Sequence, residues 1–185
     1  MNMKRKNNAI FLGAGELYFA KDGKYVVTVL GSCVSLTIYH KLSGYAGMFH
    51  ALYPECKDKD IENIINKPEA YKYADCAVLK ILKLFEEKEI PKEELDIKLF
   101  GGSEIISKSK KSVFSVGKQN VEKIQEILHK EGVSITTINT GGSDGRKIIF
   151  NSKNGGVFMK KIKNINISDE YELMKKNKGI RELAI

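Results

Sequence analysis

Short runs of residues typical of β-strands fill most of the first fifty positions of the chain. These runs are residues 16–20, 25–30, 33–39 and 45–52, and apolar and small polar side chains alternate along the third of them. Turn-forming residues separate the runs. The Asp22-Gly23 pair between the first two is a strong signal for a β-hairpin. We therefore predict that this part of the chain forms a meander of strands.

Two later segments carry the period of amphipathic helices. In the first, residues 71–88, apolar side chains recur at helical spacing, and Pro68 is expected in its first turn. The second runs from about Asn120 to Lys130, and Gly132 is its expected stop. A loop is predicted at residues 103–115, and further strands are predicted at residues 95–100, 133–139, 146–150 and 157–162, the last two joined as a hairpin.

The order of these elements indicates an α+β fold. We expect a mixed or antiparallel β-sheet sandwich with flanking helices rather than a doubly wound parallel sheet. A length of 185 residues suits one domain. We divide the chain into a basic N-terminal tail at residues 1–9, a globular domain at 10–162 and a charged C-terminal extension at 163–185.

Composition narrows the cellular setting and the classes of partner. No apolar run approaches the roughly 18 residues of a membrane span. Near the N-terminus, Glu16 interrupts a short apolar run that would otherwise resemble a secretory signal. We therefore expect a cytoplasmic protein without a secretory signal. The net charge of +8 raises the question of nucleic acid. Because the chain has only three arginines and its lysines are spread along its length, we expect a solvated basic surface and no nucleic-acid partner.

The cysteines and glycines exclude several kinds of site. Three cysteines without CxxC spacing argue against a disulfide framework and a structural zinc and for reduced thiols. Glycine-rich fingerprints of nucleotide-binding loops are absent from the sequence. We therefore expect neither a metal nor a cofactor.

One cysteine occupies an unusual local setting. Cys33 follows Gly31-Ser32 at the start of a predicted strand, where nearby backbone N–H groups can bind an anion. His50 ends the next predicted strand, and antiparallel pairing of the two strands makes Cys33 and His50 neighbours. An imidazole beside a thiol can take its proton and generate the thiolate nucleophile. The alternative is that both are ordinary strand residues.

The remaining cysteines and histidines have simpler interpretations. Cys76 lies beside the apolar stripe of a predicted helix and is expected to pack as a small hydrophobe, and Cys56 lies in a polar loop. His40 is next to a turn and His129 is near the end of a predicted helix, so we expect structural roles for both.

Six separated segments form a more specific pattern. They are Thr28 to Leu36, Gly47 to Pro54, Tyr73 to Ala77, Lys98 to Ser103, Gly117 to Val121 and Thr140 to Lys147. In order and spacing this set resembles the motifs of the CheD family of chemoreceptor deamidases, and the resemblance extends over about residues 10–162.

The resemblance implies a CheD-like cysteine hydrolase fold and an enzyme that converts chemoreceptor glutamines to glutamates through a Cys thioester. Cys33 would be the nucleophile and His50 the general base and acid, without a metal or cofactor. The family's third catalytic residue is a Thr six positions before the Cys. Val27 holds that position here and Thr28 lies five before Cys33, so strand alternation turns them to opposite faces. Thr28 is our candidate, and the identity of the third residue stays open.

The resemblance also implies partners. The substrate would be the helical cytoplasmic region of methyl-accepting chemoreceptors, a CheC-type phosphatase is a second expected partner, and membrane insertion is not expected. The alternative function is a regulatory binding partner of that phosphatase with weak or no catalysis, which Val27 in place of the Thr favours. A papain-like protease is disfavoured because its local signature is absent. Gly101-Gly102 and Gly141-Gly142 would either line a groove for a receptor helix or form tight turns.

Overall fold

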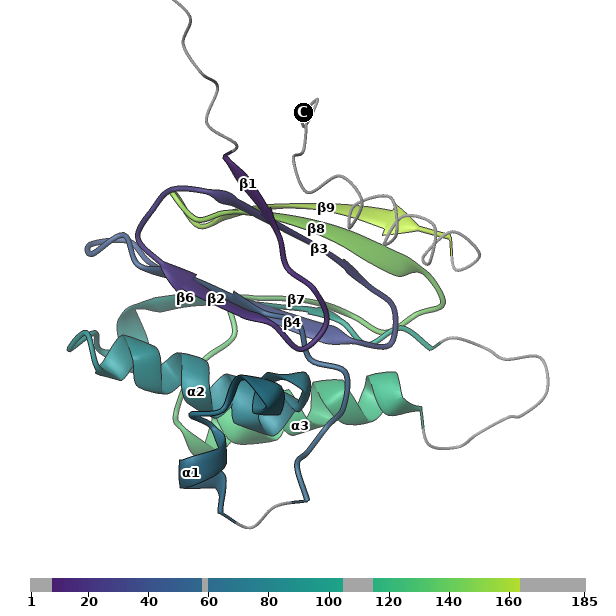
Figure 1. Cartoon of the computed structure of the whole chain (residues 1–185). Helices are drawn as coiled ribbons and strands as arrows, with labels where there is room; N and C mark the ends of the chain where they lie inside the picture. Colours follow the sequence, from purple (N-terminus) through teal and green to yellow (C-terminus); the bar gives the residue numbers. More distant parts are fainter. Residues whose placement is uncertain (1–7, 58–59, 105–114, 164–185) are drawn as a thin grey trace, which may run out of the picture.

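Two β-sheets lie face to face, and the helices cover the outer face of one of them (Figure 1). This computed structural model describes residues 8–57, 60–104 and 115–163. The first sheet has the order β1-β3-β8-β9, in which β1 and β3 run parallel and the other neighbours antiparallel. Its strands are β1 (Ala9–Phe11), β3 (Tyr25–Leu30), β8 (Gly145–Asn151) and β9 (Gly156–Ile162).

The second sheet has the order β2-β5-β4-β6-β7, in which β6 and β7 run parallel and the other neighbours antiparallel. Its strands are β2 (Leu17–Ala20), β4 (Val34–His40), β5 (Ala46–Phe49), β6 (Leu95–Gly101) and β7 (Thr137–Thr140). The helices are α1 (Ile61–Ile64), α2 (Ala74–Glu86) and α3 (Val116–Lys130), with 3₁₀ turns η1 (Pro68–Lys72) and η2 (Lys92–Glu94). The predicted α+β sandwich of mixed sheets with flanking helices is confirmed.

Strand alternation gives β3 two faces with different surroundings. Val26 and Leu30 face the second sheet and belong to the core between the sheets. Val27 and Val29 face away from it and pack with Ile162. Thr28 alternates with Val27 and Val29, so its side chain points between the two sheets. This orientation decides which side chain of β3 can contribute to a site inside the sandwich.

The apolar stripes of the two long helices pack on the outer face of the second sheet. Ile81 and Phe85 of α2 and Ile124 and Leu128 of α3 are all buried in one cluster with residues of β4 and β6. This arrangement buries one face of each amphipathic helix. It also places α3 against the sheet that carries β4, the strand that begins directly after Cys33.

The predicted hairpin at Asp22-Gly23 is wrong. β2 pairs with β5 and β3 pairs with β8, so the turn carries the chain from one sheet to the other. The carboxylate of Asp22 accepts a hydrogen bond from the Tyr18 hydroxyl and pairs with Lys24 at 3.0 Å. These contacts stabilise a corner between the sheets instead of a two-residue hairpin loop. Within the predicted meander, the pairing of β4 with β5 is confirmed.

Several predicted boundaries shift for local reasons. Pro68 lies in η1 and not in the long helix, because Tyr73 has extended backbone angles (φ −99°, ψ 131°) and separates η1 from α2. The helix α3 begins at Val116, ahead of the predicted start, because the Ser115 hydroxyl accepts a hydrogen bond from the Lys118 N–H at 3.3 Å. The strand predicted at 133–139 begins only at residue 137. The hairpin of β8 and β9 is confirmed.

Most of the predicted terminal segments and of the 103–115 loop lie outside the described residues. Residue 9, which we assigned to the tail, belongs to β1. Among the helices that the structure describes, none is long and apolar enough to cross a membrane.

Candidate active site

The loop that carries Cys33 joins the two sheets and is anchored through its carbonyl groups. The carbonyl of Gly31 accepts from the Ser103 N–H at 2.9 Å, and the carbonyl of Cys33 accepts from the Gly102 N–H at 2.8 Å. Between them, the carbonyl of Ser32 accepts from the Asn120 side-chain amide at 3.1 Å. Within the described residues the N–H groups of Ser32 and Cys33 donate to no other residue. They are therefore available to a negatively charged oxygen beside the thiol.

Close backbone contact explains the Gly101-Gly102 pair. A Cβ atom on Gly101 would lie 2.2 Å from the Cys33 carbonyl oxygen, and one on Gly102 would lie 2.4 Å from a methyl group of Val121. Both glycines have positive φ, +107° and +64°. Neither a groove wall nor a tight turn accounts for this crowding. These glycines let β6 and α3 approach the Cys33 loop closely enough to hold it.

The side chain of His50 is buried inside the sandwich and held by Thr28. His50 follows β5, is 2% exposed, and has its Nδ1 atom 2.8 Å from Thr28 Oγ1. The same hydroxyl donates its one proton to the Leu12 carbonyl at 2.8 Å. Thr28 Oγ1 must therefore accept from a protonated His50 Nδ1. In this tautomer Nε2 carries a lone pair, and Nε2 has no hydrogen-bond partner among the described residues.

Val27 cannot take the place of Thr28. Its side chain is buried on the opposite face of β3, with Val29 and Ile162, away from the core between the sheets. The structure thus brings the sequence-predicted Thr28 and His50 together and shows no contact of Val27 with His50. The Thr28 hydroxyl reaches His50 although β3 contains no bulge, since the register of β3 with β8 is continuous.

Cys33 directly precedes β4 and His50 directly follows β5, so the two residues lie at the same end of this antiparallel pair. Val34 forms a bridge with Ala51, and continuing this antiparallel register puts Ser35 opposite His50 and Cys33 one diagonal step away. Side chains at such diagonal positions share a face of the sheet. Consistent with this, Cys33 packs against the core between the sheets, which is also the side of His50 that contacts Thr28. The predicted hairpin is right, and its register puts Cys33 and His50 two residues away from direct opposition.

Burial favours the uncharged forms of both side chains. It raises the pKa of the Cys33 thiol to about 11. It lowers the pKa of His50 to about 4, against a smaller opposing effect of the Leu12 carbonyl. At neutral pH the resting site therefore holds a thiol and a neutral imidazole.

Two polar residues of the site were missed as functional candidates by sequence reasoning. The Asn120 amide donates to the carbonyls of Ser32 (3.1 Å) and Leu52 (2.9 Å), so it connects the loop of Cys33 with the segment after His50. Its only sequence signal was its place in one of the six family-like segments. Ser35 is fully buried opposite His50, and its hydroxyl has no partner among the described residues. Its spacing of two residues from Cys33 could have indicated the shared face.

The other cysteines and histidines lie elsewhere. Cys76 is fully buried in a small apolar cluster, and Cys56 packs against that cluster. His40 lies 2.8 Å from both Ser43 Oγ and Glu94 Oε2, which is the structural role expected for it, and His129 lies in the last turn of α3. Within the described residues no group of three or more His, Cys, Asp or Glu side chains is placed to hold a metal ion.

Comparison with known proteins identifies relatives over most of the chain. The sequence model of a family described as CheD, chemotactic sensory transduction, matches residues 58–161. The probable chemoreceptor glutamine deamidase CheD 2 of Geobacter sulfurreducens is 33% identical over 153 residues, which are 83% of this chain and 89% of that protein. The corresponding protein of Maridesulfovibrio salexigens is 32% identical over 83% of this chain and 91% of its own length.

Cys33 and His50 precede the segment that the family model matches. Among solved structures, the hypothetical protein YfiH of Bacillus licheniformis aligns with a TM-score of 0.43 and 8% identity over 69% of this chain and 51% of its own. This likeness is too low to bear on fold or function.

Proposed function

This chain belongs to the CheD family, and from that premise we propose that it is a chemoreceptor glutamine deamidase with Cys33 as nucleophile and His50 as general base and acid. Thr28 is a positioning residue that acts through His50. The observation that carries this assignment is the chain of hydrogen bonds from His50 Nδ1 through Thr28 to the Leu12 carbonyl. It leaves a buried nitrogen lone pair on the side of the sheet shared with Cys33.

The first half of the reaction forms a thioester. Cys33 Sγ attacks the side-chain carboxamide carbon of a receptor glutamine while His50 Nε2 takes the thiol proton. The carbonyl oxygen becomes negatively charged and is bound by the N–H groups of Ser32 and Cys33. The protonated Nε2 then gives its proton to the amide nitrogen, the carbon–nitrogen bond breaks, and ammonia leaves.

The second half releases the product. Water attacks the thioester carbon while His50 Nε2 takes one of its protons, and the same N–H groups bind the oxyanion again. Collapse of this intermediate breaks the carbon–sulfur bond, and the proton on His50 returns to Cys33. The product is a glutamate side chain and the enzyme is regenerated. Because the two reacting groups are neutral at rest, the proton moves together with the attack and not before it.

The alternative, a regulatory partner of a CheC-type phosphatase without catalysis, loses the feature that favoured it. That feature was Val27 at the expected position of the Thr, whereas Thr28 Oγ1 lies 2.8 Å from His50 Nδ1. A CheC-type phosphatase remains part of our proposal as a second partner, as do the cytoplasmic location and the methyl-accepting receptor helices as substrate.

A deamidation assay with matched variants tests this function. The protein is incubated with receptor signalling fragments, and glutamine-to-glutamate conversion is followed by peptide mass and ammonia release. We expect conversion by the wild type and none by Cys33→Ala or His50→Ala. Cys56→Ala and His129→Ala serve as matched controls, since they remove the same functional groups outside the site, and should retain activity. Conversion that persists in Cys33→Ala would refute the mechanism.

A further inference from the structure

Two cations face each other at the edge of the sandwich. Arg146 of β8 and Lys161 of β9 are directly paired in the antiparallel register. Both side chains point towards the second sheet, because they alternate in phase with Ile148 and Met159, which pack in the core between the sheets. Like charges at directly opposite positions of a sheet repel each other. Because Lys161 is exposed to solvent, an anion that binds between the two charges would relieve this repulsion.

Arg146 makes no ion pair with a described residue; burial lowers its pKa, and the charge of the nearby Asp144 carboxylate opposes this shift in part. Arg146 is 4% exposed, and its guanidinium donates to neutral oxygens of Asn139 (2.8 Å), Ser103 (2.7 Å), Gly141 (2.8 Å) and Asp144 (3.2 Å). Asp144 accepts through its backbone carbonyl. Ion pairs of Arg146 or Lys161 are absent from the part of the chain that the structure describes. A buried cation in such surroundings favours a nearby negative charge.

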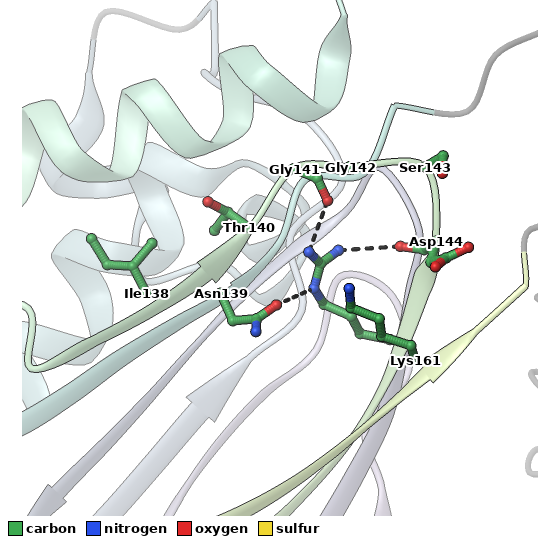
Figure 2. Close-up of a pocket in the computed structure, with 9 residues that line it drawn as sticks. Ile138, Asn139, Thr140, Gly141, Gly142, Ser143, Asp144 and Lys161 are labelled. Atoms are coloured by element: carbon green, nitrogen blue, oxygen red, sulfur yellow. Dashed lines mark hydrogen bonds between the residues drawn. The ribbon is translucent and has the colours of Figure 1, made fainter.

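A pocket of about 490 Å³ lies at this pair of cations, between β7 and the β8–β9 edge (Figure 2). In Figure 2 the side chain of Lys161 extends into the space beside the loop of residues 141–144. Gly141 and Gly142 both have positive φ, and a Cβ on either would meet nothing within 4 Å, so this loop exposes bare backbone. The N–H groups of Gly142 and Ser143 donate to no other described residue. The lining also includes Asp144, but two cations and two unpaired N–H groups outweigh this one carboxylate, so the pocket is an anion-binding surface.

The pocket is close to the Cys33 loop. The Gly141 N–H donates to the Gly101 carbonyl at 3.0 Å, and the neighbouring Gly102 N–H donates to the Cys33 carbonyl at 2.8 Å. One strand, β6, thus separates the two loops, and two strand spacings amount to roughly 10 Å. A helix rises about 1.5 Å per residue, so this distance corresponds to about seven residues, or two turns on one helix face.

We propose that this pocket is a specificity subsite that binds the carboxylate of an Asp or Glu about two helical turns from the target glutamine of the substrate. Lys161 and the N–H groups of residues 142 and 143 hold the carboxylate, and Arg146 supplies positive charge beneath it. The proposal rests on the deamidase function above. It assigns to Lys161 the choice of which glutamine reaches Cys33.

Lys161→Gln and its neighbour Lys160→Gln form a matched pair for the test. Both remove one lysine charge from β9, but Lys160 pairs with Lys147 on the opposite face of the strand. Deamidation of a receptor signalling fragment is measured as kcat and KM. We expect Lys161→Gln to raise KM about ten-fold or more with kcat unchanged, as for loss of one hydrogen bond to a charged group. Lys160→Gln should leave both values close to those of the wild type.

A second arm replaces acidic residues of the fragment within two turns of the modified glutamine by Ala. The wild type should then show the raised KM, and the KM of Lys161→Gln should not rise any further. Three results would overturn the subsite while leaving the deamidase function intact. The two lysine variants could raise KM equally, or Lys161→Gln could leave KM unchanged. Lys161→Gln and the fragment variants could also raise KM independently, so that their effects add. Absence of conversion by the wild type would overturn the function itself and the subsite with it.

Discussion

The hydrogen bond between Thr28 Oγ1 and His50 Nδ1 gives the sharpest test of how the site is organised. Thr28→Val keeps the shape of a fully buried side chain and removes its hydroxyl. The His50 Nδ1–H and the Leu12 carbonyl then both lose a partner that lies 2.8 Å away. Each buried group left unsatisfied costs about 1–3 kcal/mol, so loss of both bonds should lower the free energy of unfolding by about 2–6 kcal/mol.

The effect on catalysis should be larger than the effect on stability suggests. Without an acceptor at Nδ1, the imidazole proton can reside on Nε2, and that nitrogen can no longer take the proton of Cys33. Loss of general-base catalysis is expected to lower kcat by roughly 100-fold or more. KM should change little, because Thr28 is buried behind His50 and is not exposed to the substrate.

The assay compares three variants at a temperature where all are folded, with unfolding followed in parallel. Thr28→Ser restores a hydroxyl at the same position and should recover most of kcat. Thr37→Val replaces another buried threonine, in the middle of β4, and should retain activity. If Thr28→Val kept kcat within about three-fold of the wild type, as a purely structural effect would allow, the tautomer argument would be refuted.

Three further outcomes follow from burial and hydrogen bonding at the same site. The His50 pKa falls from 6.5 in the unfolded chain to about 4 in the fold, so its stabilising contribution is complete above pH 6.5 and is lost as the pH drops towards 4. A pKa difference of about 2.5 units corresponds to about 3 kcal/mol. Urea titrations at several pH values would detect it as a fall in the free energy of unfolding with decreasing pH, a fall that His50→Asn lacks. Alkylation of Cys33 by iodoacetamide should accelerate as the pH rises towards about 11, and a plateau already reached near neutral pH would contradict the buried thiol. Asn120→Leu leaves the carbonyls of Ser32 and Leu52 unsatisfied and should lower kcat more than it raises KM, whereas a change confined to the unfolding midpoint would show that Asn120 has no positioning role.

Local patterns of the sequence were enough for the sandwich and its helices but not for the pairing of every strand. The period of α2 and α3 and the hairpin of β8 and β9 depend on residues close in the chain, and they were predictable. The turn at Asp22-Gly23 was not, because β2 and β3 each find a partner strand far along the chain. The contact of Tyr18 with Ser152 across the sandwich, at 3.0 Å, is one such long-range determinant.

The same difference between local and long-range contacts decides which features of the site could be predicted. The pairing of β4 with β5 brings Cys33 and His50 near each other, and this could be inferred from two strands and a short turn. The choice between Val27 and Thr28 could not be made from their spacing to Cys33, because it depends on which face of β3 meets the second sheet. The role of Asn120 depends on α3 docking against the Cys33 loop, a contact between segments 88 residues apart.

Detection of the thioester tests the central claim most directly. The protein is mixed with a receptor signalling fragment, quenched in acid during turnover and measured by intact mass, and the adduct is mapped by peptide analysis. The account predicts an enzyme carrying the fragment minus ammonia, attached at Cys33, and absent from Cys33→Ala but present in Cys56→Ala. Turnover without any adduct at Cys33, together with conversion by Cys33→Ala, would contradict it.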